Sequence, residues 1–206
     1  MAKAVKRDLI DAASPGEGPK NCRRCDLWKR ATQAVPGEGP RHSTIMLVGE
    51  QPGDEEDRRG HPFVGPAGRV LDECLASARL ERGQLFVTNA VKHFKWEPRG
   101  KRRLHKKPTV GEIHACNLWL EQEIAAVKPM VIVALGATAL RALTGANLSI
   151  DGARQRELWH PGGARILSTY HPSAVLRAEG DRILELREHL EHDLRNAAKI
   201  AAGALV

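Results

Sequence analysis

Four short, mainly apolar runs are spaced along the chain, and glycine, proline or polar residues bound each of them. They occupy residues 45–48, 85–88, 130–135 and 165–169. Apolar runs of this length, rich in β-branched side chains, are typical of strands that are buried on both faces of a sheet. We therefore expect four strands in the core.

The segments between these runs have helical periodicity. Apolar side chains recur three and four positions apart in residues 66–80 and in residues 181–200. In the second segment the inward positions are Ile183, Leu186, Leu190 and Leu194. Thr109 and Glu112 form a capping box, which predicts that a helix begins there. Strands that alternate with helices predict the α/β class, as three α/β/α layers around a four-stranded, mostly parallel sheet.

The length of the chain is sufficient for one substantial core. Its 206 residues are 42% hydrophobic, and we expect a single domain over residues 1–206. Within it, residues 1–20 are expected to be an N-terminal extension, with a short helix over residues 1–13 and a Pro/Gly-rich linker. No apolar run approaches the roughly 18 residues that span a bilayer, and no signal peptide is recognisable. A cytoplasmic protein is therefore expected. We also expect it to be a monomer.

Polar side chains follow three of the four strands. Glu50, Gln51 and Asp54 come after the first strand, Asn89 after the second and His171 after the fourth. The carboxyl ends of parallel strands meet at one edge of a sheet, where open α/β folds bind their ligands. The sequence therefore predicts that these side chains converge on one site.

The charge of the chain favours a polyanionic partner. Lys and Arg outnumber Asp and Glu by 32 to 25, a net charge of +7. Bases are densest in residues 92–108, where Phe94 and Trp96 lie among them. Cations interleaved with aromatic rings are typical of DNA or RNA binding, whereas the charges alone would also suit a solvated basic loop.

Two of the four cysteines form a C-x-x-C pair, Cys22 and Cys25, directly after a Pro/Gly-rich linker. A redox pair of the thioredoxin type would follow a strand and open a helix, so a metal or cluster site is favoured. Two unliganded thiols remain the alternative. Cys74 falls on the apolar face of the helix expected over residues 66–80, which predicts a core residue.

These motifs, taken together, resemble the uracil-DNA glycosylase superfamily, and in particular its iron–sulfur branch, family four. The resemblance extends from Cys22 to about Arg177 and rests on five pieces in the same order: C-R-R-C, GEQPG, HPFVGPAG, TNAVK and HPSAVLR. It implies the α/β fold of that superfamily and an enzyme of DNA repair that excises uracil from DNA, with single-stranded DNA accepted.

The resemblance also implies roles for individual residues. Phe63 would stack on an extruded uracil, Asn89 would bind its Watson–Crick edge, and His171 would help the base to leave. Gly49 and Gln51 would lie beside the base, and Leu176 and Arg177 would fill the gap or hold the DNA backbone. Taken singly, Phe63 could be core, Asn89 a turn former and His171 a helix cap.

A four-iron four-sulfur cluster is implied as well. At the family's ligand positions this chain has Cys22, Cys25 and Cys116, with His93 where the family has a fourth cysteine. Three thiolates and one imidazole would then hold the cluster, since His replaces Cys in some other clusters. Cys74 is the rival fourth ligand, but it lies away from the family's position.

Two departures from family four matter for function. Gln51 stands where the family usually has Ala, and residues 99–107 lengthen one loop. GEQPG together with a KRR-x-H loop resembles the UdgX subgroup, whose members become covalently joined to DNA after excision. The implied nucleophile is His105. The implied DNA-binding cations are Lys101, Arg102, Arg103, Lys106, Lys107 and Arg177.

The expected chemistry is the cleavage of an N-glycosidic bond, which forms an oxocarbenium-like sugar and a uracil anion. Glu50 is placed to stabilise the sugar cation, with Asp54 and Gln51 beside it in the catalytic set. His105 must be neutral to attack the sugar, and we expect the surrounding cations to lower its pKa. The alternatives are a conventional glycosylase that uses water, a non-catalytic binding module and an electron-transfer protein.

Overall fold

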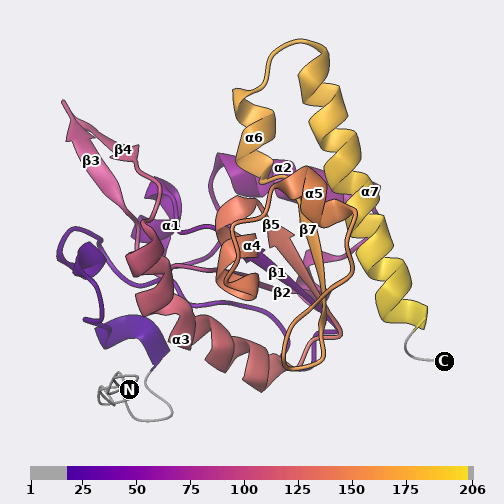
Figure 1. Ribbon diagram of the computed structural model, residues 1–206. Coiled ribbons are helices and arrows are strands. Elements are labelled where there is room, and N and C mark those ends of the chain that lie inside the picture. Colours follow the sequence, from indigo (N-terminus) through magenta and orange to yellow (C-terminus); the bar gives the residue numbers. More distant parts are fainter. Residues whose placement is uncertain (1–17, 204–206) are drawn as a thin grey trace, which may run out of the picture.

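The protein has a central sheet between two layers of helices (Figure 1), in a computed structural model that describes residues 18–203. The main sheet has five strands in the order β2-β1-β5-β7-β6. Their bounds are β1 (Ile45–Gly49), β2 (Phe86–Asn89), β5 (Val131–Leu135), β6 (Leu158–Trp159) and β7 (Arg165–Thr169). The four expected strands are all present and pair in parallel, whereas β6 is an additional, antiparallel edge strand. β6 is not predicted from the sequence, because two residues carry no periodicity.

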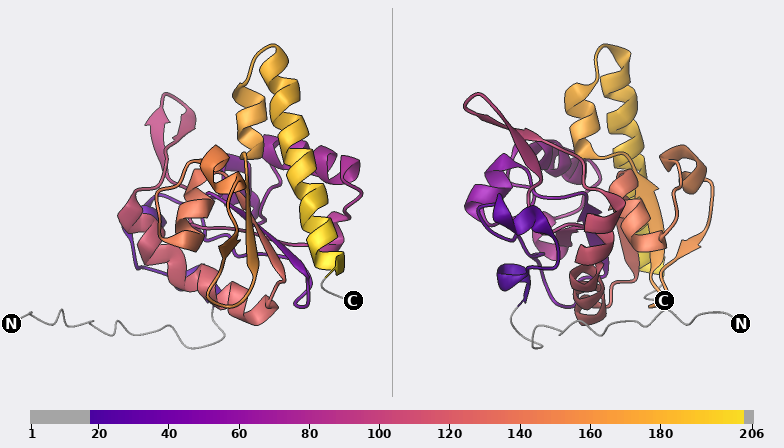
Figure 2. Two further views of the ribbon diagram at one scale, coloured as in Figure 1. Left: turned by 45° about the vertical axis from the view of Figure 1, so that its right-hand side comes forward. Right: turned by 60° about the vertical axis from the view of Figure 1, so that its left-hand side comes forward.

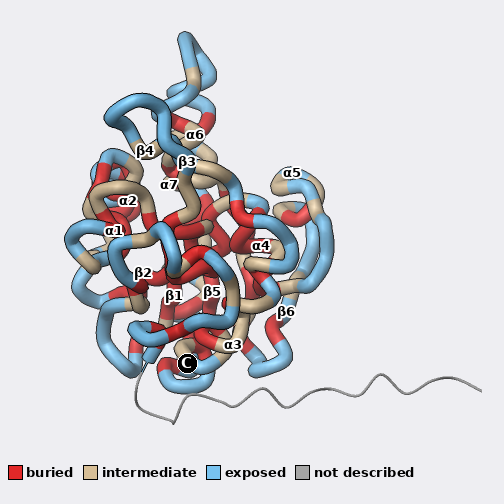
Figure 3. The backbone as a smooth tube through the Cα atoms, turned by 90° about the vertical axis from the view of Figure 1, so that its left-hand side faces the viewer, coloured by how far each residue is buried: buried red, intermediate tan, exposed pale blue. Residues whose placement is uncertain are grey.

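Both faces of the sheet are buried, as the apolar runs predict. Met46 and Val48 of β1 pack against one set of helices, α3 (Val110–Val127) and α4 (Ala137–Thr144). Leu47 packs on the opposite face with α2 (Pro66–Ser77) and α7 (Asp181–Gly203). Successive side chains of a strand point to opposite faces, so every position of such a strand must be apolar. Figure 2 shows the helices on either side of the sheet, and Figure 3 shows β1, β2 and β5 as buried backbone.

Helix boundaries follow the local signals closely. The capping box is confirmed: the Thr109 hydroxyl accepts the Glu112 N–H at 3.3 Å, and the Glu112 carboxylate accepts the Thr109 N–H at 2.6 Å. In α7, Leu186, Leu190 and Leu194 are buried as expected, but Ile183 is 36% exposed. The prediction for Ile183 is wrong because the first turn of α7 projects beyond the sheet (Figure 1). The helix predicted over residues 1–13 lies outside the described residues.

The expected loop over residues 99–107 is wrong in form, because most of it belongs to a β-hairpin. It consists of β3 (Trp96–Arg99) and β4 (Arg102–His105), paired antiparallel. The turn is two residues long and begins at Gly100, which has φ +58°, a conformation that favours glycine. In Figures 1 and 2 this hairpin projects from the body on the same side as the turn between α6 (Pro172–Arg177) and α7.

Short elements complete the described chain. They are η1 (Gly18–Asn21), η2 (Asp26–Lys29), α1 (Asp54–Arg59), η3 (Arg82–Gln84) and α5 (Ile150–Arg154). Among residues 18–203, no helix combines the length and the apolar character that crossing a bilayer requires.

Candidate active site

A cavity of about 830 Å³ lies at the carboxyl ends of β1, β2 and β7, the edge where open parallel sheets bind ligands. Its lining includes Glu50, Phe63, Asn89, His105, Thr138 and His171. The fold therefore brings together the polar side chains that follow three different strands. It also adds His105 from the end of the hairpin.

One end of the cavity has the features of a slot for a flat polar ring. The Phe63 ring lies 5.8 Å from the His171 ring, with 29° between their planes. Asn89 is 2% exposed, and its buried Oδ1 has no hydrogen-bond partner among the described residues. A buried, unsatisfied amide oxygen is available to a ligand N–H group. Phe63 and Asn89 thus offer an aromatic face and a hydrogen-bonding edge at one place.

Two glycines make this slot possible. A Cβ on Gly49 would lie 2.3 Å from Asn89 Oδ1 and 2.5 Å from Phe63 Cζ, so any larger residue would displace both groups. A Cβ on Gly68 would lie 1.9 Å from the Phe63 carbonyl oxygen. Gly68 therefore lets α2 pack against the main chain of Phe63, which has φ +54°. This left-handed conformation is rare for a bulky residue and persists only when its surroundings hold it.

His171 is arranged as a neutral hydrogen-bond donor. Its Nδ1 accepts the Ser173 N–H at 3.1 Å and lies 2.8 Å from Ser173 Oγ, which in turn accepts a hydrogen bond from Arg177 at 3.0 Å. Because Nδ1 acts as an acceptor, the ring proton of the neutral imidazole belongs on Nε2. Burial, reinforced by Arg177 and His105, lowers the pKa of His171 to about 4. The ring is therefore uncharged at neutral pH.

Glu50 and His105 lie next to each other in the lining of the cavity. The Thr138 hydroxyl, in the first turn of α4, donates a hydrogen bond to one oxygen of Glu50. The other oxygen, Oε1, lies 3.4 Å from His105 Nε2. Partial burial lowers the pKa of His105, Arg177 lowers it further, and Glu50 opposes the shift. The expected direction is confirmed, but burial and Arg177 cause it instead of the cations of the hairpin.

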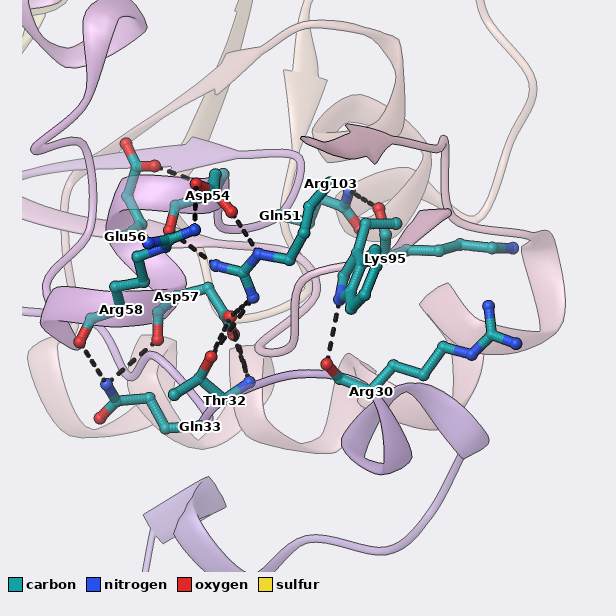
Figure 4. A network of polar contacts seen from close by, with 12 residues as sticks. Arg30, Thr32, Gln33, Gln51, Asp54, Glu56, Asp57, Arg58, Lys95 and Arg103 are labelled. Atoms are coloured by element: carbon teal, nitrogen blue, oxygen red, sulfur yellow. Dashed lines mark hydrogen bonds and ion pairs between the residues drawn. The ribbon is translucent and has the colours of Figure 1, made fainter. Parts of the chain in front are cut away.

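Arg103 fastens the hairpin to the body of the protein (Figure 4). Its guanidinium donates to the carboxylates of Asp54 and Asp57. Asp57 is fully buried and also accepts hydrogen bonds from the N–H and hydroxyl groups of Thr32, at 2.9 and 2.6 Å. The prediction that Arg103 contacts DNA phosphate is therefore corrected. On β4, Arg103 and His105 are two positions apart and share a face, so both point toward the body.

Gln51 holds together the open end of the same hairpin, where its two strands join the body of the protein. Its Nε2 donates to the carbonyl oxygens of Lys95 at 3.2 Å and Lys106 at 3.0 Å, and its Oε1 accepts the Lys95 N–H at 3.1 Å. Figure 4 shows this contact with Lys95. The carboxamide thus bridges the two ends of the hairpin. This arrangement favours a positioning role for Gln51 over the expected contact with a nucleobase. Asp54, expected in the catalytic set, is instead engaged in the ion pair with Arg103.

Comparison with known proteins agrees with this geometry. The sequence model of the uracil DNA glycosylase superfamily matches residues 36–195. This chain belongs to the uracil-DNA glycosylase superfamily. A type-4 uracil-DNA glycosylase of Thermotoga maritima is 38% identical over 194 residues, which cover 94% of this chain and 95% of the relative. A type-4 enzyme of Pyrobaculum aerophilum is 39% identical over 169 residues, 77% and 81% of the two chains. A type-5 enzyme of the same organism is 30% identical over 176 residues, 76% and 73%.

The other cations that were predicted to bind DNA differ in how accessible they are to a DNA strand. Lys101 and Arg102 are exposed at the tip of the hairpin, and Lys107 and Arg177 line the cavity. Lys106 instead pairs with Glu97 at 2.8 Å, within the hairpin. Lys101, Arg102, Lys107 and Arg177 are therefore the cations best placed to meet a phosphate backbone.

The cysteines expected to bind a cluster lie near one another. Cys22 and Cys116 are buried, Cys25 is half-buried, and all three are free thiols. The Trp119 indole N–H donates to Cys22 Sγ at 3.1 Å, and the Lys92 N–H donates to Cys116 Sγ at 3.2 Å. Burial raises the pKa of Cys116 to about 12, and Cys25 and Cys22 add to that shift. N–H donors directed at sulfur are the contacts that stabilise thiolate ligands.

These residues fit a cluster only in part. Within residues 18–203, no group of three or more His, Cys, Asp or Glu side chains is arranged to hold a metal ion. His93 is buried. It directly follows Lys92, whose backbone N–H donates a hydrogen bond to Cys116 Sγ. Cys74 is fully buried in α2, in the core on the other face of the sheet. The prediction that Cys74 is a core residue is confirmed.

Three side chains that matter at the site were missed in the sequence. Thr138 holds Glu50, Asp57 holds Arg103, and Glu56 accepts the N–H groups of Gly53 at 3.1 Å and Gly65 at 2.9 Å. Thr138 follows the third strand, so the rule that placed Glu50 and Asn89 at strand ends would also have found it. Asp57 and Glu56 lie in an acidic run that gives no local sign of burial.

Proposed function

We propose that this protein excises uracil from DNA and then becomes covalently joined to the abasic sugar through His105, as in the UdgX subgroup. One observation carries the proposal: His105 Nε2 lies 3.4 Å from the Glu50 carboxylate, in the cavity that also holds Phe63 and Asn89. One cavity is thus lined by a nucleophile, by a group that stabilises a cation, and by a slot for the base. The type-4 relatives are named as uracil-DNA glycosylases, which supports the first half of the reaction.

The first step is the departure of the base. Uracil leaves the DNA stack and enters the slot, where Phe63 stacks on its face and Asn89 binds its edge. The C1′–N1 bond then breaks, and its electron pair leaves with the base. The His171 Nε2–H group donates to a carbonyl oxygen of uracil as negative charge develops there. Solvent finally protonates the uracil anion.

The second step is the capture of the sugar. The Glu50 carboxylate stabilises the positive charge that develops at C1′ and O4′. The lone pair of neutral His105 at Nε2 forms a bond with C1′, and the ring becomes an imidazolium beside Glu50. A group held at the reacting carbon has an effective concentration far above that of an ordinary solute, on the order of 10⁵ M or more. His105 therefore competes with water for the sugar.

Denaturing electrophoresis tests this proposal. The protein is mixed with a labelled oligonucleotide that contains one uracil, and we expect a band that survives heat and detergent, at one adduct per chain. The matched oligonucleotide with thymine in place of uracil is expected to give none. Free abasic DNA and repeated turnover would instead identify a conventional glycosylase, in which Glu50 orients water. Uracil retained in the DNA would identify a binding protein without catalysis.

The partner in this proposal is uracil-containing DNA, and single-stranded DNA is included. The hairpin that carries Lys101 and Arg102 projects on the same side of the protein as the turn after α6, the helix that carries Arg177 (Figure 1). A strand that runs over this side would meet cations from both elements. The protein is proposed to act as a monomer, since the fold of a single chain brings Glu50, Asn89, His105 and His171 together.

Arg103→Met is expected to reduce adduct formation about tenfold while uracil release changes little. The substitution removes the ion pairs with Asp54 and Asp57, so the hairpin no longer presents His105 at one place; the loss of a positioned group costs at least this much. The yield of adduct and the yield of released uracil are measured on the same samples. Arg102→Met, on the outward face of β4, is the control and should leave their ratio unchanged.

We also propose that Cys22, Cys25, Cys116 and His93 hold a four-iron four-sulfur cluster. A cluster is larger than a single ion, so its ligands are more widely spaced than those of a metal ion. The N–H groups that meet Cys22 and Cys116 would support such ligands. When bound, the cluster would supply a structural link between the segment at residues 22–25 and α3. No step of the reaction depends on it.

His93→Ala is expected to remove most of the iron, whereas Cys74→Ala is expected to leave it in place. The first change deletes a proposed ligand, and the second deletes a buried thiol in a different part of the core. Iron content per chain and visible absorption measure the result. Iron lost from Cys74→Ala but retained in His93→Ala would show that the fourth ligand is wrongly assigned.

A further inference from the structure

Lys92 is a fully buried lysine directly behind the base slot, and no step proposed above uses its side chain. Its Nζ donates three hydrogen bonds of 2.7 Å each, to Thr88 Oγ1, the Asn89 carbonyl oxygen and the Glu123 carboxylate. Glu123, on α3, also accepts the Thr88 hydroxyl at 2.7 Å and the Gly37 N–H at 2.8 Å. Every donor of the ammonium group is therefore used.

Stability alone is a poor explanation for this buried pair. Desolvation of two charges costs about as much as their attraction returns, and well-packed apolar residues often replace such pairs without loss. Lys92 is 0% exposed, and Val91 and Phe94, close to it in the sequence, are buried as well, so an apolar side chain would be the simpler choice at this position. The contacts of the pair therefore point to a positional role.

The element that the pair positions is Asn89. The Asn89 carboxamide has no hydrogen bond within the described residues, and its Oδ1 is buried without a partner. Its direction therefore depends on packing and on how the main chain is held. Lys92 holds the carbonyl of Asn89, and the next two residues are tied to the first strand: the Ala90 N–H donates to the Gly49 carbonyl and the Val91 N–H to the Glu50 carbonyl, at 2.9 and 3.0 Å.

We propose that Lys92, with Glu123, is a positioning residue for base recognition: it fixes the main chain of Asn89 so that the free carboxamide meets the edge of uracil. This inference rests on the proposed function, because it takes uracil as the occupant of the slot. The pair also links α3, the helix that carries Cys116, to the end of β2, where Asn89 lies.

The test compares Lys92→Met with Lys95→Met. Lys95 makes a similar ion pair with α3, through Glu112 at 2.8 Å, but its side chain does not reach Asn89. Calorimetric titration with free uracil measures the slot directly, and single-turnover excision measures the reaction. Lys92→Met should weaken uracil binding about tenfold, because one well-placed hydrogen bond changes an affinity by about that factor. It should slow excision about 100-fold, because a misplaced group at a reacting centre lowers the rate by about that factor. Lys95→Met should change neither by more than about twofold.

A third readout separates positioning from damage to the fold. Affinity for DNA that carries a tetrahydrofuran abasic site depends on the backbone contacts, so Lys92→Met should keep it within about threefold of the wild type. Thr88→Val, which removes one hydroxyl from the network and keeps the side-chain shape, should weaken uracil binding in the same direction by a smaller factor. If Lys92→Met does not fold, Thr88→Val still allows uracil binding to be tested.

The outcomes distinguish this inference from the function on which it rests. A wild type that neither binds free uracil nor excises it would overturn both. If the wild type binds and excises uracil, while Lys92→Met and Thr88→Val bind it equally well, the inference alone is overturned. Equal losses of uracil binding and abasic-site binding would also overturn it, because they would show a general loss of structure.

Discussion

His105→Ala is expected to abolish the denaturant-stable adduct with uracil-DNA completely, while uracil is still released. The substitution removes the only proposed group that bonds to C1′, but Phe63, Asn89 and His171 still bind the base and assist its departure. Water then attacks the sugar, so the variant should turn over repeatedly. Electrophoresis under denaturing conditions measures the adduct, and chromatography measures the free uracil in the same reaction.

A matched histidine serves as the control. His114 is exposed on α3 and lies outside the lining of the cavity, so His114→Ala should form the adduct as the wild type does. An adduct formed by His105→Ala would contradict the assignment of the nucleophile. Loss of both uracil release and adduct would show instead that His105 is needed for bond cleavage.

The pH dependence of the wild type provides a second check on His105. The imidazole attacks only when it is neutral, and neutral rings predominate above the pKa. Burial and Arg177 lower the pKa of His105 below its ordinary value. The pH at which the rate of adduct formation falls to half of its maximum should therefore lie below about 6.5, the ordinary pKa of histidine. A decline centred at that ordinary value would contradict the partly buried position of the ring.

Gly49→Ala is expected to reduce uracil excision by about 100-fold or more, the typical cost of displacing groups by about 1 Å at a reacting centre. The added Cβ would lie 2.3 Å from Asn89 Oδ1 and 2.5 Å from Phe63 Cζ. Both side chains are buried and have little room to move, so the slot for the base must change shape. Single-turnover excision at saturating protein measures the loss, since binding of the DNA backbone is then complete.

Gly111→Ala is the matched control for this prediction. Gly111 lies in the first turn of α3, and a Cβ there would meet nothing within 4 Å. Its excision rate should equal that of the wild type. If Gly49→Ala excises uracil at the wild-type rate, the base does not occupy the space between Asn89 and Phe63, and the position of the slot is wrong.

Local signals in the sequence identified most of the scaffold. The four parallel strands were recognisable because both faces of the sheet are buried, which requires apolar runs such as residues 130–135. The start of α3 was recognisable because Thr109 and Glu112 satisfy each other's backbone groups within one turn. The convergence of Glu50, Asn89 and His171 followed from a general property of parallel sheets, whose carboxyl ends share one edge.

By itself, the sequence determined the class of the fold, the motifs of the superfamily and the set of polar residues at the strand ends, since periodicity and motif order are local properties of a chain. Only the tertiary structure decided the form and attachment of the hairpin. Arg103 joins Asp54 across 49 positions, and Gln51 joins Lys95 across 44. Such contacts depend on how distant segments pack. The sequence alone therefore predicts that Arg103 binds DNA, and only the fold shows that buried Asp57 lies beside it.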